Sequence, residues 1–269
     1  MAKSKRLRLV IVGPGRAGSS IAIAAERAGH EIVGVLARTQ GTTDWPDLVW
    51  DEALPETDIA FIAVRDDDIA AVSERIAPIA ENVGVVAHMS GFTPVLVLHH
   101  LQERGIAVGG FHPLVSLPDP HTGAGALAGG FVGIGGDPLA VDMLTHLAST
   151  LGMEHFRLDD TARPAYHAAA AAAANFVVAS LAISGDLFDS AGVDPRVSRP
   201  LVERVVANVF DKGPAASLTG PIVRGDVETV IGHLTAAHQV SDYVGRQFKL
   251  MAEATAIRAG REEDLRRWK

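Results

Sequence analysis

The chain has 269 residues, of which 48% are hydrophobic and 21% are charged, a globular composition that predicts a sizeable core. Its formal net charge of −8 disfavours binding to nucleic-acid phosphates, so no nucleic-acid partner is expected. The absence of cysteine excludes disulfides, thiolate nucleophiles and cysteine-ligated zinc, and it suits a reducing, cytoplasmic location. No other grouping of side chains indicates a metal site.

The first part of the chain, residues 1–157, alternates short β-branched runs with helical patterns. We predict strands over 7–13, 31–37, 58–64, 83–90, 105–112 and 130–136. Continuous apolar strands that alternate with helices are typical of a mostly parallel sheet covered on both faces. This part is therefore predicted to be an α/β domain.

The second part, residues 158–269, lacks β-rich runs and is predicted to be an all-α domain. A long helix is expected over 165–191, and further helices follow Asp194 and Asp226. The stretch 165–183 approaches the length of a membrane span, but alanine contributes little transfer energy, and the polar residues within it would need partners in lipid. We therefore expect a buried helix of a soluble protein and no membrane partner.

A glycine-rich segment, VGPGRAGSS, follows the first predicted strand and places Gly13, Gly15 and Gly18 in the GxGxxG spacing. The first glycine allows a tight turn, the second lets the backbone approach a pyrophosphate, and the third lets the helix pack on the strand. The alternative is a glycine-rich turn without a ligand. We interpret the segment as the dinucleotide-binding loop of a Rossmann-type domain. The expected contacts are Gly13, Pro14, Gly15, Arg16, Ala17 and Gly18.

The end of the second predicted strand, VLART, indicates which dinucleotide binds. NAD sites usually carry Asp or Glu there to hold the ribose 2′-hydroxyl, whereas this chain has Arg38 and Thr39. Arg38 can pair with a 2′-phosphate; the alternative is a solvated surface charge. Val64, at the end of the third predicted strand, is expected to meet the cofactor with its backbone. We therefore predict NADPH as the cofactor.

Two polar residues are candidates for completing hydride chemistry, because carbonyl reduction also needs a proton donor. Ser90 and His112 follow neighbouring predicted strands, whose carboxyl ends face one crevice. An imidazole titrates near neutrality, so His112 is the candidate proton donor, and Ser90 is expected to orient the carbonyl or the imidazole. The alternative is that Ser90 caps a turn and His112 fills a hydrogen-bonded niche beside Pro113.

Four residues of the second domain are further candidates. His167 and Asn175 share roughly one stripe of the long helix, where the surrounding alanines leave them accessible. Thr219 and Arg224 lie in the connector SLTGPIVRGD, and Arg224 could bind a substrate carboxylate. The alternatives are a buried, backbone-bonded Asn175 and an Arg224 that pairs with Asp226 or caps a helix start.

Five segments occur in a recognisable order: VGPGRAGSS, HMSG, FHPLVSLPDP, AYHAAAAAAANF and LTGPIVRGD. Together they resemble a bacterial family in which a Rossmann-like domain precedes a C-terminal helical domain of unknown function. The resemblance implies membership of the 6-phosphogluconate-dehydrogenase-like group, which includes pyrroline-5-carboxylate reductase, ketopantoate reductase and prephenate dehydrogenase. In that group the helical domain commonly dimerises and closes the active site, which implies a homodimer through that domain.

Each of these relatives is matched only in part. Ketopantoate reductases use a Lys-xxx-Asn pair, whereas Ala171 stands four residues before Asn175 here, and His167 is the candidate substitute. Prephenate dehydrogenases carry a serine and an HP histidine, which Ser90 and His112 resemble. We expect an NADPH-dependent oxidoreductase that reduces a small 2-oxo acid, or a related carbonyl or imine, with 2-dehydropantoate as the first candidate. The alternatives are a non-catalytic NADPH-binding sensor or partner protein, a prephenate-dehydrogenase-like enzyme and a pyrroline-5-carboxylate-reductase-like enzyme.

Overall fold

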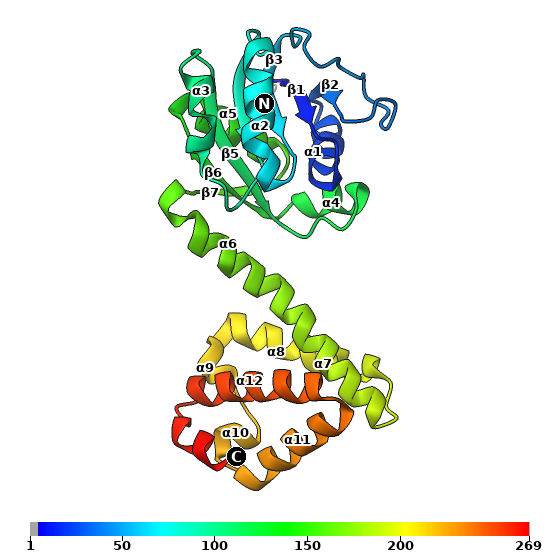
Figure 1. Cartoon of the computed structure of the whole chain (residues 1–269), viewed down its shortest axis with the longest axis vertical. Coiled ribbons are helices and arrows are strands. Elements are labelled where there is room, and N and C mark those ends of the chain that lie inside the picture. The colour runs from blue at the N-terminus through cyan, green and yellow to red at the C-terminus, as the bar shows by residue number, and fades with distance from the viewer. Residues whose placement is uncertain (1–4, 269) are drawn as a thin grey trace. The chain divides into compact units, whose positions relative to one another are not determined.

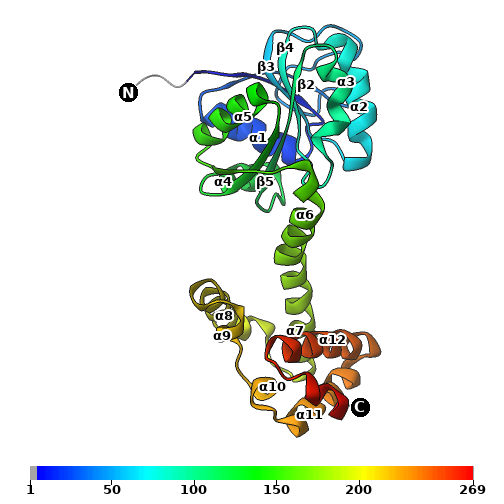
Figure 2. The ribbon, with the colours of Figure 1, turned by 90° about the vertical axis from the view of Figure 1, so that its left-hand side faces the viewer.

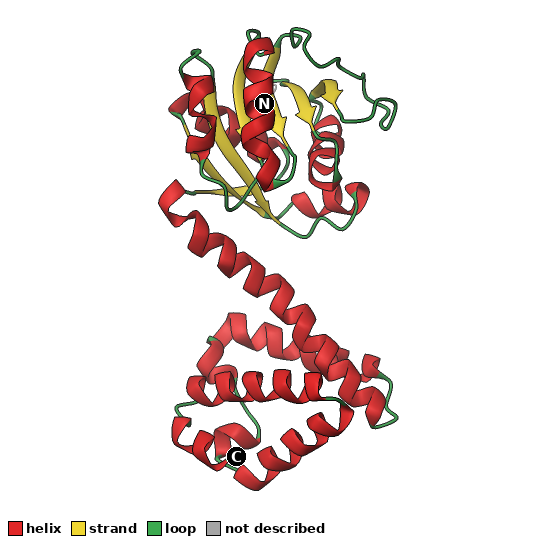
Figure 3. Cartoon of the chain, in the orientation of Figure 1, coloured by secondary structure: helices red, strands yellow, loops and turns green. Residues whose placement is uncertain are grey.

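The computed structural model describes residues 5–268 and divides into two compact units, one ending at Ala170 and the other beginning at Ala171. The first is the α/β unit and the second is all-helical, as Figure 1 and Figure 3 show. The boundary between the two compact units thus lies at 170/171, whereas the sequence analysis predicted a domain boundary at 157/158. The difference arises because helix α6 (Arg163–Ala171) begins with an arginine that is fully buried in the first unit.

The first unit is built on a seven-stranded sheet with the strand order β2-β1-β3-β4-β5-β6-β7. The strands are β1 (Arg8–Val12), β2 (Glu31–Leu36), β3 (Thr57–Ile62), β4 (Val83–His88), β5 (Ala107–Leu114), β6 (Phe131–Gly136) and β7 (Glu154–Arg157). Neighbouring strands from β2 to β5 pair in parallel, β6 is antiparallel to β5, and β7 is parallel to β6. The predicted α/β class with a mostly parallel sheet is confirmed, and the carboxyl ends of β1, β3, β4 and β5 lie along one edge.

Helices cover both faces of this sheet, as Figure 2 shows. On one face lie α1 (Arg16–Arg27), α4 (Pro120–Leu127) and α5 (Pro138–Thr150), and on the other lie α2 (Ile69–Ile76) and α3 (His99–Gln102). Each face has its own cluster of fully buried side chains, with Phe61 and Phe111 in the first and Ile62 and Ile69 in the second. This two-sided burial explains why the strand sequences are apolar throughout rather than alternating.

The second unit contains only helices among its described residues. They are α7 (Val177–Ser190), α8 (Arg199–Lys212), α9 (Pro214–Ser217), α10 (Pro221–Arg224), α11 (Val227–Val240) and α12 (Asp242–Arg258). Two small clusters hold the unit together: Val230 and Leu234 pack with Trp268, and Ile183 packs with Val244. Helix α8 contributes no buried residue, although it is fourteen residues long.

A long helix joins α6 to α7 through a π-helical turn at Ala172–Phe176. Within the described chain, one continuous helix, Asp160–Ser190, is long and apolar enough to cross a membrane by length and composition alone. Core helices of soluble proteins pass the same test, but they are mostly buried, whereas the described residues of α6, the π-helical turn and α7 bury only Arg163 and Ile183. The prediction of a buried helix is therefore wrong for the single chain, because the helical unit covers little of this helix. One such helix is weak evidence for a membrane span.

Candidate functional site

The glycine loop between β1 and α1 has the geometry that a pyrophosphate requires. Gly13 has a φ of +88°, which only glycine adopts readily. A Cβ at Gly18 would lie 2.6 Å from the carbonyl oxygen of Gly13, so α1 can approach β1 only because residue 18 has no side chain. A Cβ at Gly15 would point into open space, and no side chain caps the first turn of α1. The backbone N–H groups of that turn are therefore available to an anion.

A cavity of about 700 Å³ opens beside this loop at the carboxyl ends of β1, β2 and β3. Its lining includes six of the nine residues predicted to bind the cofactor, namely Gly13, Pro14, Gly15, Arg38, Thr39 and Val64. Arg16, Ala17 and Gly18 belong to the first turn of α1 and are not part of the lining. The residues present thus form a cradle with the size and backbone geometry that a dinucleotide needs.

The cavity lining includes arginines that the sequence analysis missed, together with one acidic residue, Asp68. Arg38, Arg65 and Arg75 all line the cavity. The guanidinium of Arg75 lies 4.1 Å from the centre of the Trp50 ring, and it also pairs with Asp51 at 3.2 Å. Trp50 lies in the long segment between β2 and β3, which has no periodic pattern, so only the fold could bring it to the cavity.

Ser90 follows β4 and holds a tight turn together. Its Oγ donates a hydrogen bond to Asp66 Oδ2 at 2.8 Å and accepts from the backbone N–H groups of Phe92 and Thr93. The hydroxyl hydrogen is therefore already used, which matches the turn-capping alternative for Ser90. Its expected part in orienting a carbonyl or an imidazole stays a prediction.

His112 lies in β5 and meets two aromatic side chains from the start of α6. Its Nδ1 is 2.7 Å from the hydroxyl of Tyr166, and its ring centre is 5.9 Å from that of His167. Burial, followed by the charges of His167 and Arg163, lowers the pKa of His112 to about 4. His112 is therefore neutral at physiological pH. Tyr166, which the sequence analysis did not single out, carries a pKa raised to about 12 by burial.

A fully buried arginine fixes the beginning of α6 against the strand ends. Arg163 donates from Nη1 to the carbonyl oxygen of Ser90 at 2.9 Å and from Nε to Asp160 Oδ1 at 2.8 Å. Burial raises the pKa of Asp160, but the backbone N–H groups of Val95 and Leu96 and the guanidinium outweigh it, so the pKa is lowered. Tyr166 and His167 are thereby held over the carboxyl ends of β4 and β5.

The remaining predicted residues belong to the second unit. Asn175 is exposed on the π-helical turn, Thr219 is exposed before α10, and Arg224 is the exposed last residue of α10. Asp226 caps α11 through the N–H and the hydroxyl of Thr229. The roles of Asn175, Thr219 and Arg224 stay predictions.

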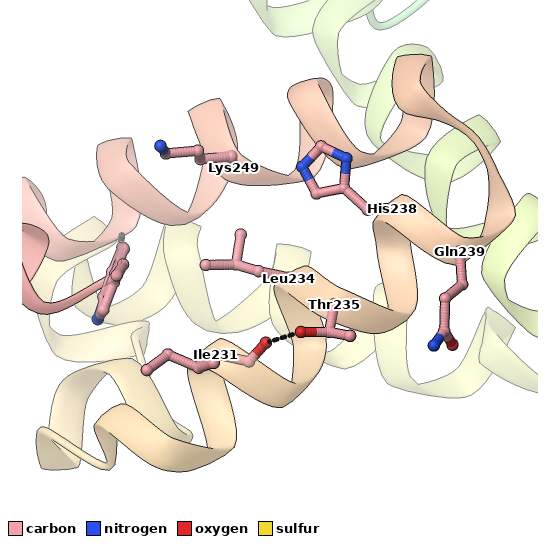
Figure 4. Close-up of a pocket in the computed structure, with 7 residues that line it drawn as sticks. Ile231, Leu234, Thr235, His238, Gln239 and Lys249 are labelled. Carbon is pink, nitrogen blue, oxygen red and sulfur yellow. Dashed lines mark hydrogen bonds between the residues drawn. The ribbon is translucent and has the colours of Figure 1, made fainter.

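A second cavity, of about 520 Å³, lies within the helical unit between α11 and α12 (Figure 4). Leu234 and Thr235 line it from α11 and Lys249 lines it from α12, and Thr235 donates its hydroxyl hydrogen to the carbonyl oxygen of Ile231. Its lining contains none of the predicted site residues. The candidate site is therefore the strand-end edge of the first unit.

Two family models match the chain, and the junction between them lies within the sheet of the first unit rather than at the boundary between the two units. Residues 1–113 match the family model of a Rossmann-like domain, and residues 131–255 match that of a domain of unknown function, DUF2520. No curated protein gives a significant match.

Solved structures share the fold over nearly the whole chain. A Bacteroides fragilis protein assigned as an NADP oxidoreductase has a TM-score of 0.75 and 21% identity, covering 94% of this chain and 98% of its own. An imine reductase from Myxococcus stipitatus in complex with NADP+ has a TM-score of 0.68 and 15% identity, covering 97% and 99%. Pyrroline carboxylate reductase of Plasmodium falciparum with NADP bound has a TM-score of 0.62 and 14% identity, covering 93% and 98%. At these identities the likeness concerns the fold.

Proposed function

We propose that the chain, which matches the models of a Rossmann-like domain and of a DUF2520 domain, is an NADPH-dependent oxidoreductase. The single observation that carries this proposal is the glycine-lined cavity with three arginines in its lining. It offers backbone N–H groups for a pyrophosphate and Arg38 for a 2′-phosphate. Structures with this fold include proteins solved with NADP bound, which supports the same cofactor.

The proposed reaction reduces a small carbonyl or imine. The cofactor supplies a hydride when bound, and the protein must provide a proton and hold the substrate. His112 is the proposed proton donor, since it lies at the strand ends and meets two further protonatable side chains there. Asn175 and Arg224 are the proposed substrate contacts.

Two classes of substrate are proposed, small 2-oxo acids and cyclic imines. Arg224, the proposed contact for a substrate carboxylate, and the resemblance to ketopantoate reductases favour a small 2-oxo acid. The first candidate remains 2-dehydropantoate. The lysine of those enzymes is replaced by Ala171, however, so a different proton donor is required. Imine and pyrroline carboxylate reductases share the fold, which makes cyclic imines the second group to test.

The direct test of the cofactor is a titration of the purified protein with NADPH and NADH. We expect tighter binding of NADPH. Replacing Arg38 by alanine (Arg38→Ala) should weaken NADPH binding by about 10- to 100-fold, because a charged hydrogen bond to phosphate contributes about 1.5–3 kcal/mol. NADH binding should change little. The matched control is Arg27→Ala, which removes an exposed arginine from the far end of α1.

The activity is tested by following NADPH oxidation with 2-dehydropantoate, other small 2-oxo acids and cyclic imines. Turnover of one of these substrates, lost in a His112→Ala variant that still binds NADPH, is the expected outcome. Tight NADPH binding without oxidation of any of them would instead support a sensor or partner protein. Equal affinity for NADH and NADPH would contradict the role proposed for Arg38.

We also propose that the protein acts as a homodimer formed through the helical unit. Helix α8 buries none of its residues and exposes Leu201, Val205, Val206 and Phe210, the last at 85% exposure. Phe176, the last residue of the π-helical turn, is also exposed, as are Val177, Val178 and Leu181 at the start of α7. Apolar surface of this extent is typical of an interface, and a second copy of the chain is the proposed partner rather than a membrane.

A further inference from the structure

Tyr166 contacts the candidate proton donor, His112, at the Nδ1 atom of its ring. The phenol oxygen lies 2.7 Å from Nδ1 of His112, and the two rings meet edge to face with centres 5.5 Å apart. We propose that Tyr166 is a positioning residue, which donates its hydroxyl hydrogen to Nδ1 of His112 and so fixes the His112 proton on Nε2. This inference deepens the proposed function and rests on it.

We assign the direction of that hydrogen bond from the partners of the phenol. Among the described residues its hydroxyl forms no other hydrogen bond, so its hydrogen goes to Nδ1 of His112. Burial raises the pKa of Tyr166 to about 12 and lowers that of His112 to about 4, so at neutral pH the pair is a phenol and a neutral imidazole. A neutral imidazole carries one hydrogen and offers one acceptor. If Tyr166 donates to Nδ1, the ring hydrogen must be on Nε2.

Nε2 of His112 points to a place that a side chain would otherwise occupy. A Cβ built on Gly91 would lie 2.8 Å from Nε2 of His112 and 2.8 Å from Nδ1 of His167. Nδ1 of His167 is buried and has no hydrogen-bond partner among the described residues. Two imidazole nitrogens therefore converge over a glycine, with His112 presenting a donor there.

The surroundings keep His112 neutral and leave Tyr166 as its proton source. The charged and titratable groups around His112 are Asp66, His88, Arg163, Tyr166 and His167. Asp66 is engaged by the hydroxyl of Ser90, and Arg163 by Asp160 and the carbonyl oxygen of Ser90. No carboxylate among the described residues forms a hydrogen bond with the ring of His112.

The proton transfer that follows is balanced. NADPH, when bound, would supply the hydride to the carbonyl carbon. The part of His112 is to protonate the substrate oxygen: its Nε2–H bond breaks and an O–H bond forms. The Tyr166 O–H bond breaks at the same time and an Nδ1–H bond forms, so the ring stays neutral. The phenolate that remains takes a proton from solvent water. The transfer is downhill, because an alkoxide is a stronger base than the phenolate of Tyr166.

The tautomer can be tested without any turnover. In uniformly 15N-labelled protein, the His112 resonances, assigned by their loss in a His112→Asn variant, should show a protonated Nε2 and an unprotonated Nδ1. A Tyr166→Phe variant should shift this population towards the other tautomer. A wild-type His112 that carries its proton on Nδ1 would overturn the proposal, whether or not the protein reduces a substrate.

The kinetic test uses the same variant, because Phe keeps the ring that packs on Phe156. Once a substrate is known, Tyr166→Phe should lower kcat by about 10- to 100-fold with little change in KM or in NADPH binding. The chain has two tyrosines, so Tyr243→Phe, at an exposed position in the helical unit, is the matched control.

The outcomes separate this inference from the proposed function. NADPH oxidation that is as fast in Tyr166→Phe as in wild type would overturn the role of Tyr166 and leave the oxidoreductase intact. Failure of every substrate, together with the expected tautomer, would overturn the proposed function and leave the Tyr166–His112 geometry supported. Loss of kcat with an unchanged tautomer in Tyr166→Phe would also count against the inference.

Discussion

Arg163 is the residue on which the geometry of the candidate site depends most. Its guanidinium is fully buried and reaches Asp160 and the carbonyl oxygen of Ser90, while Nη2 has no partner among the described residues. A buried charge that loses its partners is strongly destabilising. The guanidinium fits against β5 because Gly110 has no side chain at the point of contact.

Gly110→Ala is expected to destabilise the protein by about 2–4 kcal/mol. The added Cβ would overlap Nη2 of Arg163, and the guanidinium cannot retreat without giving up its hydrogen bonds to Asp160 and Ser90. The measurement is the free energy of unfolding from denaturant titration.

Gly125→Ala is the matched control for this prediction, because a Cβ at Gly125 in α4 would meet nothing within 4 Å. Alanine should leave stability there unchanged or raise it by up to about 1 kcal/mol, through helix propensity. Equal effects of the two substitutions would show that Arg163 can move freely.

Among the elements, the sequence predicted the central strands and the long helix, since these carry strong apolar patterns. It missed β7, whose residues Glu154, His155 and Arg157 are exposed, and α4, which contains two glycines and is held by the Asp119 cap and by contact with α1. Edge elements of this kind form through tertiary contacts rather than through periodicity.

The same distinction applies to the candidate site. The glycine loop, Arg38 and the two strand ends that carry Ser90 and His112 could be found because each follows an apolar strand. Trp50 and Tyr166 could not, because they reach the site from a loop and from a helix whose positions depend on packing. Tyr166 lies one residue before His167, which the sequence analysis did select and which also meets His112, so the sequence identified the helix but not the residue that bonds to His112.

Histidines on β4 and β5, His88 and His112, make the free energy of unfolding depend on pH. Burial and then the charge of Arg163 lower the pKa of His88 to about 3, and that of His112 is lowered to about 4. The pKa of His30 is also lowered, first by burial. An unfolded chain takes up protons at these histidines below about pH 6.5, where the folded protein does not.

Stability from these groups is therefore complete above about pH 6.5 and falls as the pH drops towards about 4. By about pH 5 the loss should amount to roughly 2 kcal/mol for each strongly shifted histidine. Urea titrations between about pH 7 and about pH 5 measure it. A His112→Gln variant should show a shallower dependence, whereas His121→Gln, at an exposed histidine, should keep the wild-type slope. A stability that is level over this range would contradict the burial of these rings.

We expect the protein to form a homodimer through the helical unit at micromolar concentration. Leu201→Lys, on α8, should raise the dimer dissociation constant by about tenfold or more, because it places a charge in the proposed apolar interface. Sedimentation velocity measures the shift. Leu139→Lys is the matched control, since Leu139 is similarly exposed in the first unit, at 55% against 65% for Leu201. A wild-type protein that sediments as a monomer would contradict the proposed interface.

The junction between the two family matches determines where the chain can be divided without breaking the sheet. The Rossmann-like match ends at residue 113 inside β5, and the DUF2520 match begins at residue 131, the first residue of β6. These two strands are antiparallel partners over six residue pairs in one sheet. A cut of the chain at that junction would divide a continuous sheet rather than separate two folded bodies, so neither matched segment is expected to fold by itself.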